Sequence, residues 1–293
     1  MKKQKYTITD FRADFPDDNA CLEWLKEYLY PDGVFCPNDK KITPHHKLKN
    51  RRAYSCELCG HHTYPTANTI FHKSSTPLTL WFYAIYLMSS TRAGISAKQL
   101  ERELGVTYKT AWRMFHQIRK MMADDTGNLS GEVEIDETYY MPNRRMRTSA
   151  EKRPKKSGEM VFGMVERGGK IKAIHLDGEV TTAKVFPVIE EHVAKGTIVF
   201  TDTAMTYRSL HKIYEHYQTN HGLKQYVSGN NHTQNIENFW SNMKRGVRGV
   251  YRHVDAKYLQ AYADEYAFRY SRRNHFEHMF WAILNKTSNS KQS

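Results

Sequence analysis

The sequence predicts an α/β protein: a mixed β-sheet domain preceded by a small cysteine-bearing module and a module of helices. Three observations support this fold class. Residues 131–140 alternate apolar and polar side chains, as a half-buried strand does, and two more strand-like runs follow them. Residues 34–66 hold two cysteine-bearing turns among short strand-like segments. Residues 77–122 instead space their apolar side chains at helical intervals.

The composition favours a polyanionic partner. The 293 residues leave room for more than one domain, and 44 lysines and arginines against 31 aspartates and glutamates give a net charge of +13 and a pI near 9.4. Nucleic acid is the leading candidate, because Lys and Arg neutralise phosphates. An ordinary basic enzyme is the alternative, since net charge describes solubility and encounter rather than fold.

Nothing in the sequence predicts a secreted or membrane protein. Residues 1–11 are basic but lack the apolar run and the small-residue cleavage site of a signal peptide. The longest uninterrupted apolar run, residues 80–88, is too short to cross a bilayer. We therefore expect a soluble, cytoplasmic protein without a membrane partner.

The N-terminal segment is expected to form a helix followed by a zinc-ribbon-like fold. Residues 17–30 have the spacing of an amphipathic helix, in which Cys21 packs. A Pro-Asp-Gly turn at residues 31–33 ends this helix, and the segment after it is too small to bury a core of its own. Such segments are stabilised by a zinc ion held between two ligand-bearing turns.

Three cysteines supply most of a tetrahedral Zn2+ site. Cys56 and Cys59 have the CxxC spacing that lets two thiolates reach one ion, and Cys36 opens the first turn. Asp39 stands where a second cysteine of the first turn would be. Each candidate for the fourth position fits a solvated loop equally well. The fourth ligand is therefore left open among Asp39, His45 and His46.

Residues 77–122 predict helices with a DNA-binding arrangement. An apolar helix over residues 77–90 fits a packing role. Residues 95–122 divide into two amphipathic helices around Gly105-Val106, as in a helix-turn-helix, and an ordinary helical hairpin is the alternative. In a helix-turn-helix the exposed start of the second helix contacts DNA. Here that start carries Tyr108, Lys109, Thr110 and Arg113.

After a polar linker, the sequence predicts the mixed sheet. Three strands form a meander with a Gly168-Gly169 hairpin signal, and a helix then leads to a fourth strand. Pro187 lies inside that helix and is expected to kink or shorten it. A basic loop at residues 142–158 is expected to be mobile and to touch phosphates. The expected elements are strands over residues 131–140, 160–166, 170–176 and 197–202 and a helix over residues 182–192.

Three acidic side chains fall at positions that this sheet would bring together. Asp136 is expected to end the first strand, Asp202 ends the fourth, and Glu237 lies on an amphipathic helix over residues 232–246. Clustered carboxylates repel one another unless a cation lies between them, and oxygen ligands suit Mg2+ or Mn2+. Such a site can hold two ions for an in-line displacement at phosphorus. Glu137 should point to the opposite face of its strand, and three unrelated surface acids are the alternative.

The helix that carries Glu237 also carries a basic residue. Lys244 follows Glu237 by almost two helical turns, so both side chains project from one face of the helix. His232 and Asn235 are expected to cap the helix rather than to contact DNA. The aromatic and apolar residues between the two charges are expected to hold the helix on the sheet; they are Phe239, Trp240 and Met243.

Several stretches together resemble a known family. EIDETYY, FTDTAMTY and NHTQNIENFWSNMKRGVRGVYRH look like the three catalytic blocks of insertion-sequence transposases with an RNase H-like DDE domain, of the zinc-ribbon group related to Merlin elements. The resemblance extends to FPDDNACLEWLKEYLYPDGVFCP, TIFHKSSTPLTLWFYAIYLM, GISAKQLERELGVTYKTAWRM and KYLQAYADEYAFRYSRR. It covers the chain from Phe15 to Arg273, and the order of the blocks is specific. Asp39, where the family shows cysteine, departs from the pattern.

The resemblance implies the site residues and their cofactors. Asp136, Asp202 and Glu237 match the metal-binding triad, which holds two Mg2+ or Mn2+ ions. Lys244 matches the basic residue that grips the phosphate of the DNA end, and its neighbour Arg245 is expected to contact DNA as well.

Four segments follow from these motifs. Residues 1–76 form the N-terminal helix and zinc-ribbon-like module, and residues 77–123 form the helix-turn-helix region. Residues 131–275 form the RNase H-like DDE catalytic domain. Residues 276–293 form the end of a C-terminal helix and a polar tail.

The implied function is that of a DNA transposase. Such an enzyme binds the terminal inverted repeats of its insertion sequence in double-stranded DNA, cleaves there and joins the 3′ hydroxyl ends to target DNA. The implied assembly is a homodimer or a higher oligomer on DNA, at the nucleoid of a bacterial cell. Two alternatives stay open: an RNase H-like structure-selective nuclease or resolvase, and a DNA-binding regulator whose catalytic domain has decayed.

Overall fold

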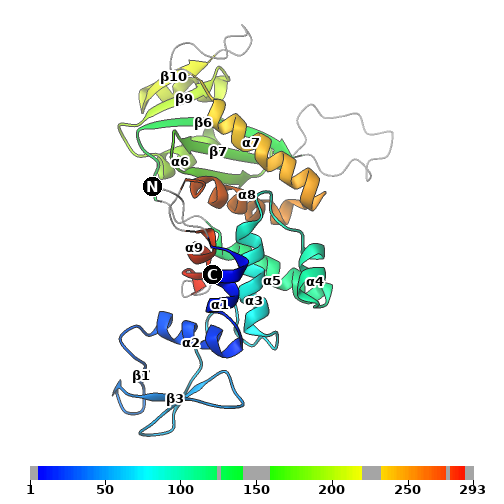
Figure 1. The fold of residues 1–293 in the computed structure, drawn as a ribbon. Coiled ribbons are helices and arrows are strands. Elements are labelled where there is room, and N and C mark those ends of the chain that lie inside the picture. The colour runs from blue at the N-terminus through cyan, green and yellow to red at the C-terminus, as the bar shows by residue number, and fades with distance from the viewer. Residues whose placement is uncertain (1–5, 124–126, 141–158, 220–231, 275–277, 288–293) are drawn as a thin grey trace. The chain divides into compact units, whose positions relative to one another are not determined.

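The chain forms two compact units, shown in Figure 1. Unit 1 comprises residues 1–121 and 275–293, and unit 2 comprises residues 122–274. The basic loop expected at residues 142–158 lies outside the described part of the chain. Within the described part, no helix has the length and apolar character needed to span a membrane. The computed structural model describes residues 6–123, 127–140, 159–219, 232–274 and 278–287.

Two short helices open unit 1. α1 (Ile8–Asp14) begins with a capping box, and α2 (Asp18–Leu29) begins after Asp17, whose carboxylate accepts hydrogen bonds from two amides of the first turn. α2 confirms the helix expected over residues 17–30, and Cys21 is fully buried in it.

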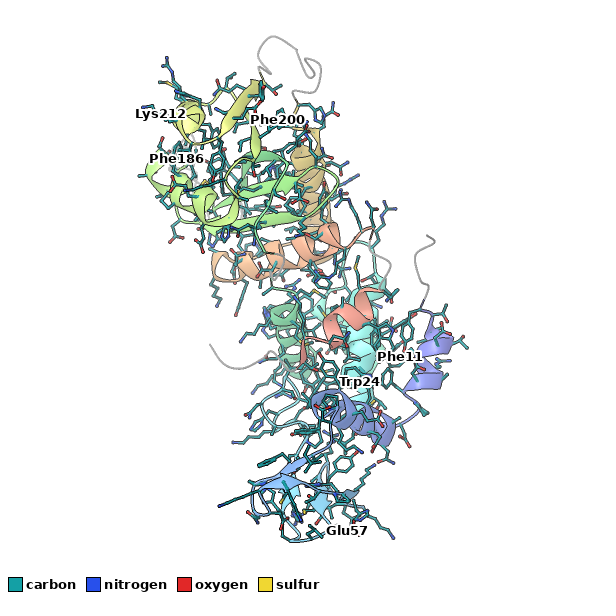
Figure 2. All side chains as sticks on the ribbon, turned by 90° about the vertical axis from the view of Figure 1, so that its left-hand side faces the viewer. Phe11, Trp24, Glu57, Phe186, Phe200 and Lys212 are labelled. Carbon is teal, nitrogen blue, oxygen red and sulfur yellow. The ribbon has the colours of Figure 1, made fainter. Side chains whose placement is uncertain are left out.

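Aromatic side chains form the core of unit 1. α3 (Leu78–Ser90) confirms the apolar helix expected at residues 77–90, and the C-terminal helix α9 (Met279–Leu284) packs against it. Edge-on and tilted ring pairs contribute beyond the area they bury, so this cluster holds α1, α2, α3 and α9 in one unit. Its rings include Phe11, Phe15, Trp24, Phe82 and Phe280, of which Phe11 and Trp24 are labelled in Figure 2.

Five very short strands between α2 and α3 form the ribbon. β1 (Phe35–Cys36) pairs with β2 (Lys41–Ile42). β4 (Tyr54–Cys56) lies between β3 (His45–Lys47) and β5 (His62–Thr63), and every pairing is antiparallel. Strands this short bury little apolar surface, which agrees with the zinc-ribbon-like fold expected from the sequence.

Two helices confirm the arrangement expected around Gly105-Val106. α4 (Ala97–Leu104) begins at the Ser96 cap, and α5 (Tyr108–Met121) follows after a short turn. Gly105 ends α4 with a φ of 64°, a left-handed conformation that glycine adopts without strain. Their shared core contains Leu100, Leu104, Ala111, Phe115 and Ile118.

Unit 2 contains a five-stranded mixed sheet in the order β10-β9-β6-β7-β8. β6 (Glu132–Tyr140), β7 (Glu159–Glu166) and β8 (Ile171–Leu176) form the expected antiparallel meander. β9 (Ile198–Asp202) runs parallel to β6, and β10 (Glu215–Thr219) runs parallel to β9. The sheet confirms the mixed α/β class expected from the sequence, and β10 is a fifth strand beyond the four that the sequence predicts.

Helices cover both faces of this sheet. α6 (Thr182–His192) and the 3-10 helix η2 (Met205–Lys212) pack on one face. α7 (Gln234–Gly246) and α8 (Ala256–Ser271) pack on the other, joined by the π-helical turn η4 (Val247–Tyr251). The sheet is therefore buried on both sides.

Pro187 does not shorten its helix, which was one of the two effects expected of it. α6 runs from Thr182 to His192, across the proline. Pro187 lies on the exposed side, whereas Val185 and Ile189 on the other side are buried. Solvent can therefore satisfy the carbonyl that a proline leaves without a partner, while the buried face holds the helix.

Candidate active site

Asp136 and Asp202 lie level with each other on adjacent parallel strands. The β6–β9 ladder pairs Val133 with Val199 and Glu134 with Phe200. Two residues further along each strand, this register places Asp136 opposite Asp202, on the face of the sheet that α7 covers. Both side chains are partly buried, and the charge of one carboxylate acts on the other.

Asp136 lies inside its strand, so the expectation that it ends the strand is wrong. β7 continues to pair with β6 as far as Tyr140, whereas β9 pairs with β6 only as far as Glu134. Asp136 therefore sits just beyond the point where β6 loses one of its two neighbours. This position leaves its carboxylate at an open edge although the strand continues.

An indole from α7 holds the carboxylate of Asp136. Trp240 donates a hydrogen bond from Nε1 to Oδ2 of Asp136 at 3.0 Å. Gly163, the cross-strand partner of Asp136, makes room for this contact, because a Cβ atom there would lie 2.5 Å from the indole of Trp240. A glycine in β7 thus allows the helix to approach the sheet at the site.

The surroundings of Asp136 disfavour its charge. Burial raises the pKa of this carboxyl group to about 7, and the negative charges of Glu137 and Asp202 act in the same direction. Hydrogen bonds from the Glu137 backbone and from Trp240 lower the pKa, but they do not cancel the shift. A carboxylate in this state gains most from a nearby cation.

Glu137 points to the opposite face of the sheet, as expected. Its carboxylate accepts a hydrogen bond from the hydroxyl group of Tyr207 in η2. Burial, followed by the charge of Glu137, raises the pKa of Tyr207 well above its usual value. Glu137 is therefore tied to η2 rather than to the face that carries Asp136.

α7 presents Glu237, Trp240 and Lys244 along one ridge, because residues spaced by three and four positions are neighbours on a helix. Trp240 lies against Asp136, so Glu237 precedes this point by one turn and Lys244 follows it by one turn. The Glu237 side chain is exposed, and its Oε1 accepts a hydrogen bond from the Thr233 hydroxyl at 3.3 Å. The buried residues that hold α7 on the sheet are Ile236, Phe239, Trp240 and Met243.

Lys244 lies within the electrostatic field of Asp136. Burial lowers the pKa of the Lys244 amine, the charge of Asp136 raises it, and the charge of Arg248 lowers it again, with a net decrease. The amine is thus partly withdrawn from water next to the carboxylate pair.

The structure brings some of the predicted residues together and leaves one apart. Asp136, Asp202 and Lys244 interact electrostatically, whereas the three predicted acids do not lie within 4.8 Å of one another as a group. Among the described residues, two other groups meet that distance. One is the cysteine cluster of the ribbon; the other is Glu159, His175 and Asp177, in which His175 Nε2 lies 2.8 Å from Glu159 Oε2.

Glu134, two residues before Asp136, is fully buried and holds the start of α7. Its carboxylate accepts hydrogen bonds from the amides of Asn235 and Ile236, at 2.8 and 3.1 Å. Nε of Arg167 donates to it at 2.9 Å. A negative charge at a helix N-terminus is stabilised by the helix dipole, so Glu134 fixes the helix that carries Glu237 to the strand that carries Asp136.

The expectation that His232 and Asn235 cap α7 is wrong. Thr233 occupies the N-cap position without a capping bond from its side chain, and the amides of the first turn are satisfied by Glu134 instead. The Asn235 side chain donates to Glu134 at 2.8 Å, and Nδ1 of His232 lies 3.2 Å from it. A buried acid from the sheet outcompetes the local side chains because it is already held in place by Arg167.

A second site forms in the ribbon. Sγ of Cys36 and Sγ of Cys59 lie 3.3 Å apart, and Sγ of Cys56 lies 3.1 Å from Oδ2 of Asp39. The ligand atoms of all four residues lie within 4.8 Å of one another. Three sulfurs and one carboxylate oxygen are a donor set for a tetrahedral zinc ion.

The two turns of the ribbon share one backbone shape. Gly60 follows Cys59 with a φ of 74°, and Lys40 follows Asp39 with a φ of 52°. The left-handed conformation is unusual for lysine, yet it is kept at the position that corresponds to the glycine. Asp39 therefore occupies the position of the absent cysteine in geometry as well as in sequence.

The histidines considered for the fourth position are engaged elsewhere. Nδ1 of His45 lies 2.9 Å from the carbonyl oxygen of Thr43. His46 is exposed, and its Nε2 lies 3.4 Å from a carboxylate oxygen of Glu57. Of the three candidates for the fourth ligand, the structure places only Asp39 with the cysteines.

The thiols lower the pKa of Asp39, whereas the surroundings of Asp136 raise the pKa of Asp136. Hydrogen bonds from Cys59, Cys36 and Cys56 lower the pKa of Asp39 to about 2. The same hydrogen bond with Asp39 is the main cause that raises the pKa of Cys59 to about 12.

Comparison with known proteins gives the family. Residues 128–271 match the model of the ISXO2-like transposase domain. This part of the chain belongs to the ISXO2-like transposase family. The match spans the strands and helices that carry Asp136, Asp202, Glu237 and Lys244. The family is one of DNA-cutting and DNA-joining enzymes.

Relatives agree with the family of the transposase domain. A protein described as an uncharacterized protein in transposable element ISH50 of Halobacterium salinarum is 24% identical and covers 85% of this chain and 90% of its own length. An uncharacterized transposase-like protein of Haemophilus influenzae is 28% identical over 31% of this chain and 74% of its own length. The crystal structure of the Mos1 strand transfer complex is similar at a TM-score of 0.30 and 10% identity, covering 72% of this chain and 76% of that one.

Ahead of the transposase domain, the start of α5 carries the four side chains that were predicted to contact DNA. Tyr108 and Lys109 are exposed, and the hydroxyl of Thr110 lies 3.1 Å from that of Thr107. Arg113 is exposed but held, because its Nη2 donates to Oγ of Ser74 at 2.7 Å. Tyr108 and Lys109 therefore project most freely from this helix.

Arg245 of the transposase domain is also exposed and held. Its Nη2 donates to Oδ1 of Asn242 at 2.7 Å on the same face of α7. It lies next to Lys244, which is partly buried. The two neighbouring cations thus differ in their contact with water.

Sequence reasoning missed Glu134, Arg167 and Gly163. The alternation around Val133 and Ile135 predicts one buried and one polar face for β6. Both faces are in fact covered by helices, so an acid on the second face needs internal partners. The usable signal was that Glu134 precedes Asp136 by two residues and must therefore share its face.

Proposed function

We propose that this chain is a DNA transposase that binds the terminal inverted repeats of its insertion sequence, cleaves the DNA there by phosphodiester hydrolysis and joins the freed 3′ hydroxyl ends to target DNA. The observation that carries the proposal is the pair of Asp136 and Asp202, level on parallel strands of an ISXO2-like transposase domain. Burial and like charge raise the pKa of one member of this pair to about 7.

The acids fit divalent cations. Asp136 and Asp202 offer oxygen donors at one edge of the sheet, and their mutual repulsion favours a cation between them. Glu237, presented by α7 on the same side of the sheet, supplies a further carboxylate. When bound, two Mg2+ or Mn2+ ions activate the attacking hydroxyl group and stabilise the leaving oxygen of the phosphodiester.

The chain's own residues position these groups. Trp240 fixes the orientation of the Asp136 carboxylate through its indole N–H. Glu134 fixes the first turn of α7, and with it the distance of Glu237 from the strand. The ammonium group of Lys244 lies near Asp136, and there it would bind the phosphate of the DNA end.

The N-terminal modules supply DNA binding in this proposal. Tyr108, Lys109, Thr110 and Arg113 at the start of α5 contact base edges and phosphates, and Lys244 with Arg245 contacts the DNA end. Two ends must be cut and joined together, so the active form is a homodimer or a larger assembly on DNA. The enzyme would act at the nucleoid, in the cytoplasm of a bacterial cell.

Zn2+ is the metal proposed for the ribbon, held by Cys36, Cys56, Cys59 and Asp39. The donor set fits because all four ligand atoms lie around one centre and the two turns share a backbone shape. Such an ion would stabilise a module that buries little apolar surface.

The proposal is tested by a strand-transfer assay. Labelled duplexes ending in the inverted repeats that flank the gene are supplied uncut and pre-cut, with Mg2+ and a plasmid target. We expect cleavage of the first and joining of both. Asp202→Asn should abolish both reactions while binding to the same duplexes is retained, since Asp202 acts on metal and not on DNA.

A matched control and two contrary outcomes sharpen this assay. Glu191→Gln removes an acid of the same unit whose side chain is 72% exposed, at the end of α6, and should leave both reactions unchanged. Cleavage without joining of pre-cut ends would indicate a nuclease or resolvase, and binding without cleavage would indicate a decayed regulator. Unchanged cleavage by the Asp202→Asn protein would contradict the site itself.

A further inference from the structure

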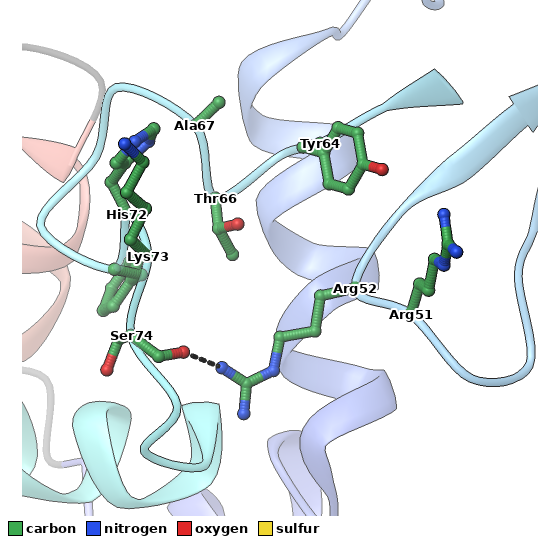
Figure 3. Close-up of a pocket in the computed structure, with 9 residues that line it drawn as sticks. Arg51, Arg52, Tyr64, Thr66, Ala67, His72, Lys73 and Ser74 are labelled. Atoms are coloured by element: carbon green, nitrogen blue, oxygen red, sulfur yellow. Dashed lines mark hydrogen bonds between the residues drawn. The ribbon is translucent and has the colours of Figure 1, made fainter. Parts of the chain in front are cut away.

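An open cavity of about 470 Å³ lies in unit 1, between the ribbon and the segment that leads into α3 (Figure 3). Its volume falls in the range of roughly 300–1,000 Å³ that is usual for ligand sites. Arg51, Arg52 and Tyr64 line one side, and His72 and Lys73 line the other. None of its lining residues is acidic.

Two cations of this cavity are available to a ligand. Arg51 and Lys73 are exposed, and neither forms an ion pair with a residue that the structure describes. Arg52 is instead neutralised by Asp18, whose Oδ2 lies 2.9 Å from its Nη2. The cavity therefore carries a net positive charge from Arg51 and Lys73 on its two sides.

Neutral donors add to these cations. The amide of Asn68 donates to Nδ1 of His72 at 3.2 Å, so the proton of the neutral ring lies on Nε2. Tyr64 is 43% exposed, and its ring forms an open wall beside Arg51. Two cations and an imidazole N–H that face one cavity without an acidic neighbour among its lining residues suit an anion.

The cavity is built on a rigid frame. Phe71 at its base is 1% exposed and packs edge-on against Trp81 of α3, with ring centroids 5.6 Å apart. Lys73 adopts a φ of 51°, a left-handed conformation that is unusual for a residue other than glycine. Backbone strain held by its surroundings is frequent at ligand sites.

Ser74 fixes this cavity relative to the helix that is proposed to enter the DNA. Its carbonyl oxygen accepts a hydrogen bond from Nη1 of Arg52 at 2.9 Å, the bond drawn in Figure 3. Its hydroxyl oxygen accepts one from Nη2 of Arg113 on α5 at 2.7 Å and one from Nε1 of Trp81 at 3.0 Å. One residue thus joins the cavity wall, α3 and the helix-turn-helix.

We propose that this cavity binds the sugar-phosphate backbone of double-stranded DNA, with Arg51 and Lys73 on the phosphates, next to the stretch contacted by α5. This deepens the proposed function and rests on it. Phosphate contacts fix the register and orientation of a protein on DNA, while the recognition helix contacts base edges. A charged cavity tied to that helix through Ser74 would set the position from which α5 meets the bases.

The salt dependence of DNA binding tests the proposal. Binding of the full chain to a labelled 30-base-pair duplex is measured by fluorescence anisotropy between about 50 and 300 mM salt. Each phosphate contact contributes a slope of about 0.9 in a plot of log K against log salt. We therefore expect Arg51→Ala/Lys73→Ala to reduce the slope by about 2 and to raise Kd roughly tenfold or more at 0.1 M salt.

Two control variants separate this effect from net charge and from folding. Lys195→Ala/Lys212→Ala removes the same charge from exposed positions of unit 2. Lys195 precedes β9 and Lys212 precedes β10, so both lie near the ends of these strands that are opposite to Asp202. This variant should leave the slope unchanged within about 0.5. Arg51→Lys/Lys73→Arg keeps both charges and should restore the wild-type slope. All variants should melt within about 2 °C of the wild type, since the changed side chains are exposed.

Each outcome bears on a different claim. A wild-type protein that binds duplex, with an unchanged slope in Arg51→Ala/Lys73→Ala, overturns the cavity proposal alone. Calorimetric binding of inorganic phosphate at micromolar Kd, with an unchanged DNA slope, would make the cavity a site for a small anion and also overturns it. A wild-type protein that binds duplex with the expected salt dependence but does not cleave it contradicts only the proposed catalytic site. A wild-type protein that binds no duplex contradicts both proposals.

Discussion

Asp136 in the sheet and Asp39 in the ribbon are both placed for a metal, but their surroundings act on them in opposite ways. Asp136 is partly buried beside two other carboxylates, and its pKa rises to about 7. Asp39 is surrounded by thiol donors, and its pKa falls to about 2. The first carboxylate is only partly compensated by its protein neighbours, whereas the second is satisfied by neighbours that would themselves become ligands.

This difference explains why the two sites suit different ions. An oxygen-only site whose anions repel each other is stabilised by a hard cation that keeps open positions for phosphate oxygens. A closed set of three sulfurs and one oxygen suits a structural ion without open positions. A third acid, Glu134, marks the other extreme: it is fully buried but compensated by Arg167 and by the amides of α7.

The largest expected effect comes from removing that compensated acid. Glu134→Ala should lower the free energy of unfolding by about 3–5 kcal/mol, because it leaves Arg167 and the first amides of α7 without a buried partner. Glu134→Gln keeps an acceptor and should cost less, about 1–3 kcal/mol. Urea unfolding followed by circular dichroism measures both. A loss below 1 kcal/mol in Glu134→Ala would show that the network does not hold α7.

Removing the partly compensated acid, Asp136, should change the free energy of unfolding in the opposite direction. The pKa of Asp136 is raised from 3.8 to about 7, so the folded state keeps a proton that the unfolded state releases, and stability falls as pH rises through this interval. Asp136→Asn removes the penalty and should stabilise the metal-free protein by on the order of 2–4 kcal/mol at pH 8 and by little at pH 4. Urea unfolding at the two pH values checks this, and a destabilised variant at pH 8 would contradict it.

The ribbon gives a smaller expected effect, on metal affinity. Asp39→Ala should weaken Zn2+ binding at least as much as removal of an outer partner does, about 10- to 100-fold or 1.4–2.7 kcal/mol. Asp39→Cys should strengthen it, because it completes a four-cysteine set in turns that already share one backbone shape. Competition with a chromogenic chelator measures both constants. Equal affinity in Asp39→Ala and the wild type would exclude Asp39 as a ligand.

The smallest effect on stability is expected at Glu237. This side chain is exposed, so Glu237→Gln should change the free energy of unfolding by no more than about 0.5 kcal/mol. Cleavage should nevertheless be lost, because the carboxylate is proposed as a metal ligand. Thermal melting and the cleavage assay on one protein preparation separate the two readouts. Retained cleavage would remove Glu237 from the site.

Much of the fold follows from sequence patterns. Strand alternation and the glycine pair at residues 168–169 predicted the meander, and the register of β6 with β9 brought Asp136 and Asp202 together as the sequence suggested. β10 was not predicted, because Glu215–Thr219 is short and its polar side chains show no alternation. These residues form a strand because they pair with β9, not because of their local β-propensity.

The supporting residues of the site were harder to predict for a physical reason. Glu134, Arg167 and Gly163 act through tertiary contacts that no local pattern records. A buried acid is interpreted as a surface residue until both faces of its strand are known to be covered. Gly163 leaves room for the indole of Trp240, a residue far from it in the sequence, so no local pattern reveals its role.

The central claim, that Asp136 and Asp202 share a divalent cation, is tested most directly by Mn2+ titration of the zinc-saturated protein in a calorimeter. The wild type and the Glu191→Gln control should bind Mn2+, and Asp136→Asn and Asp202→Asn should each lose that binding while remaining folded. Mn2+ binding of equal strength in the wild type and in both asparagine variants would contradict the claim.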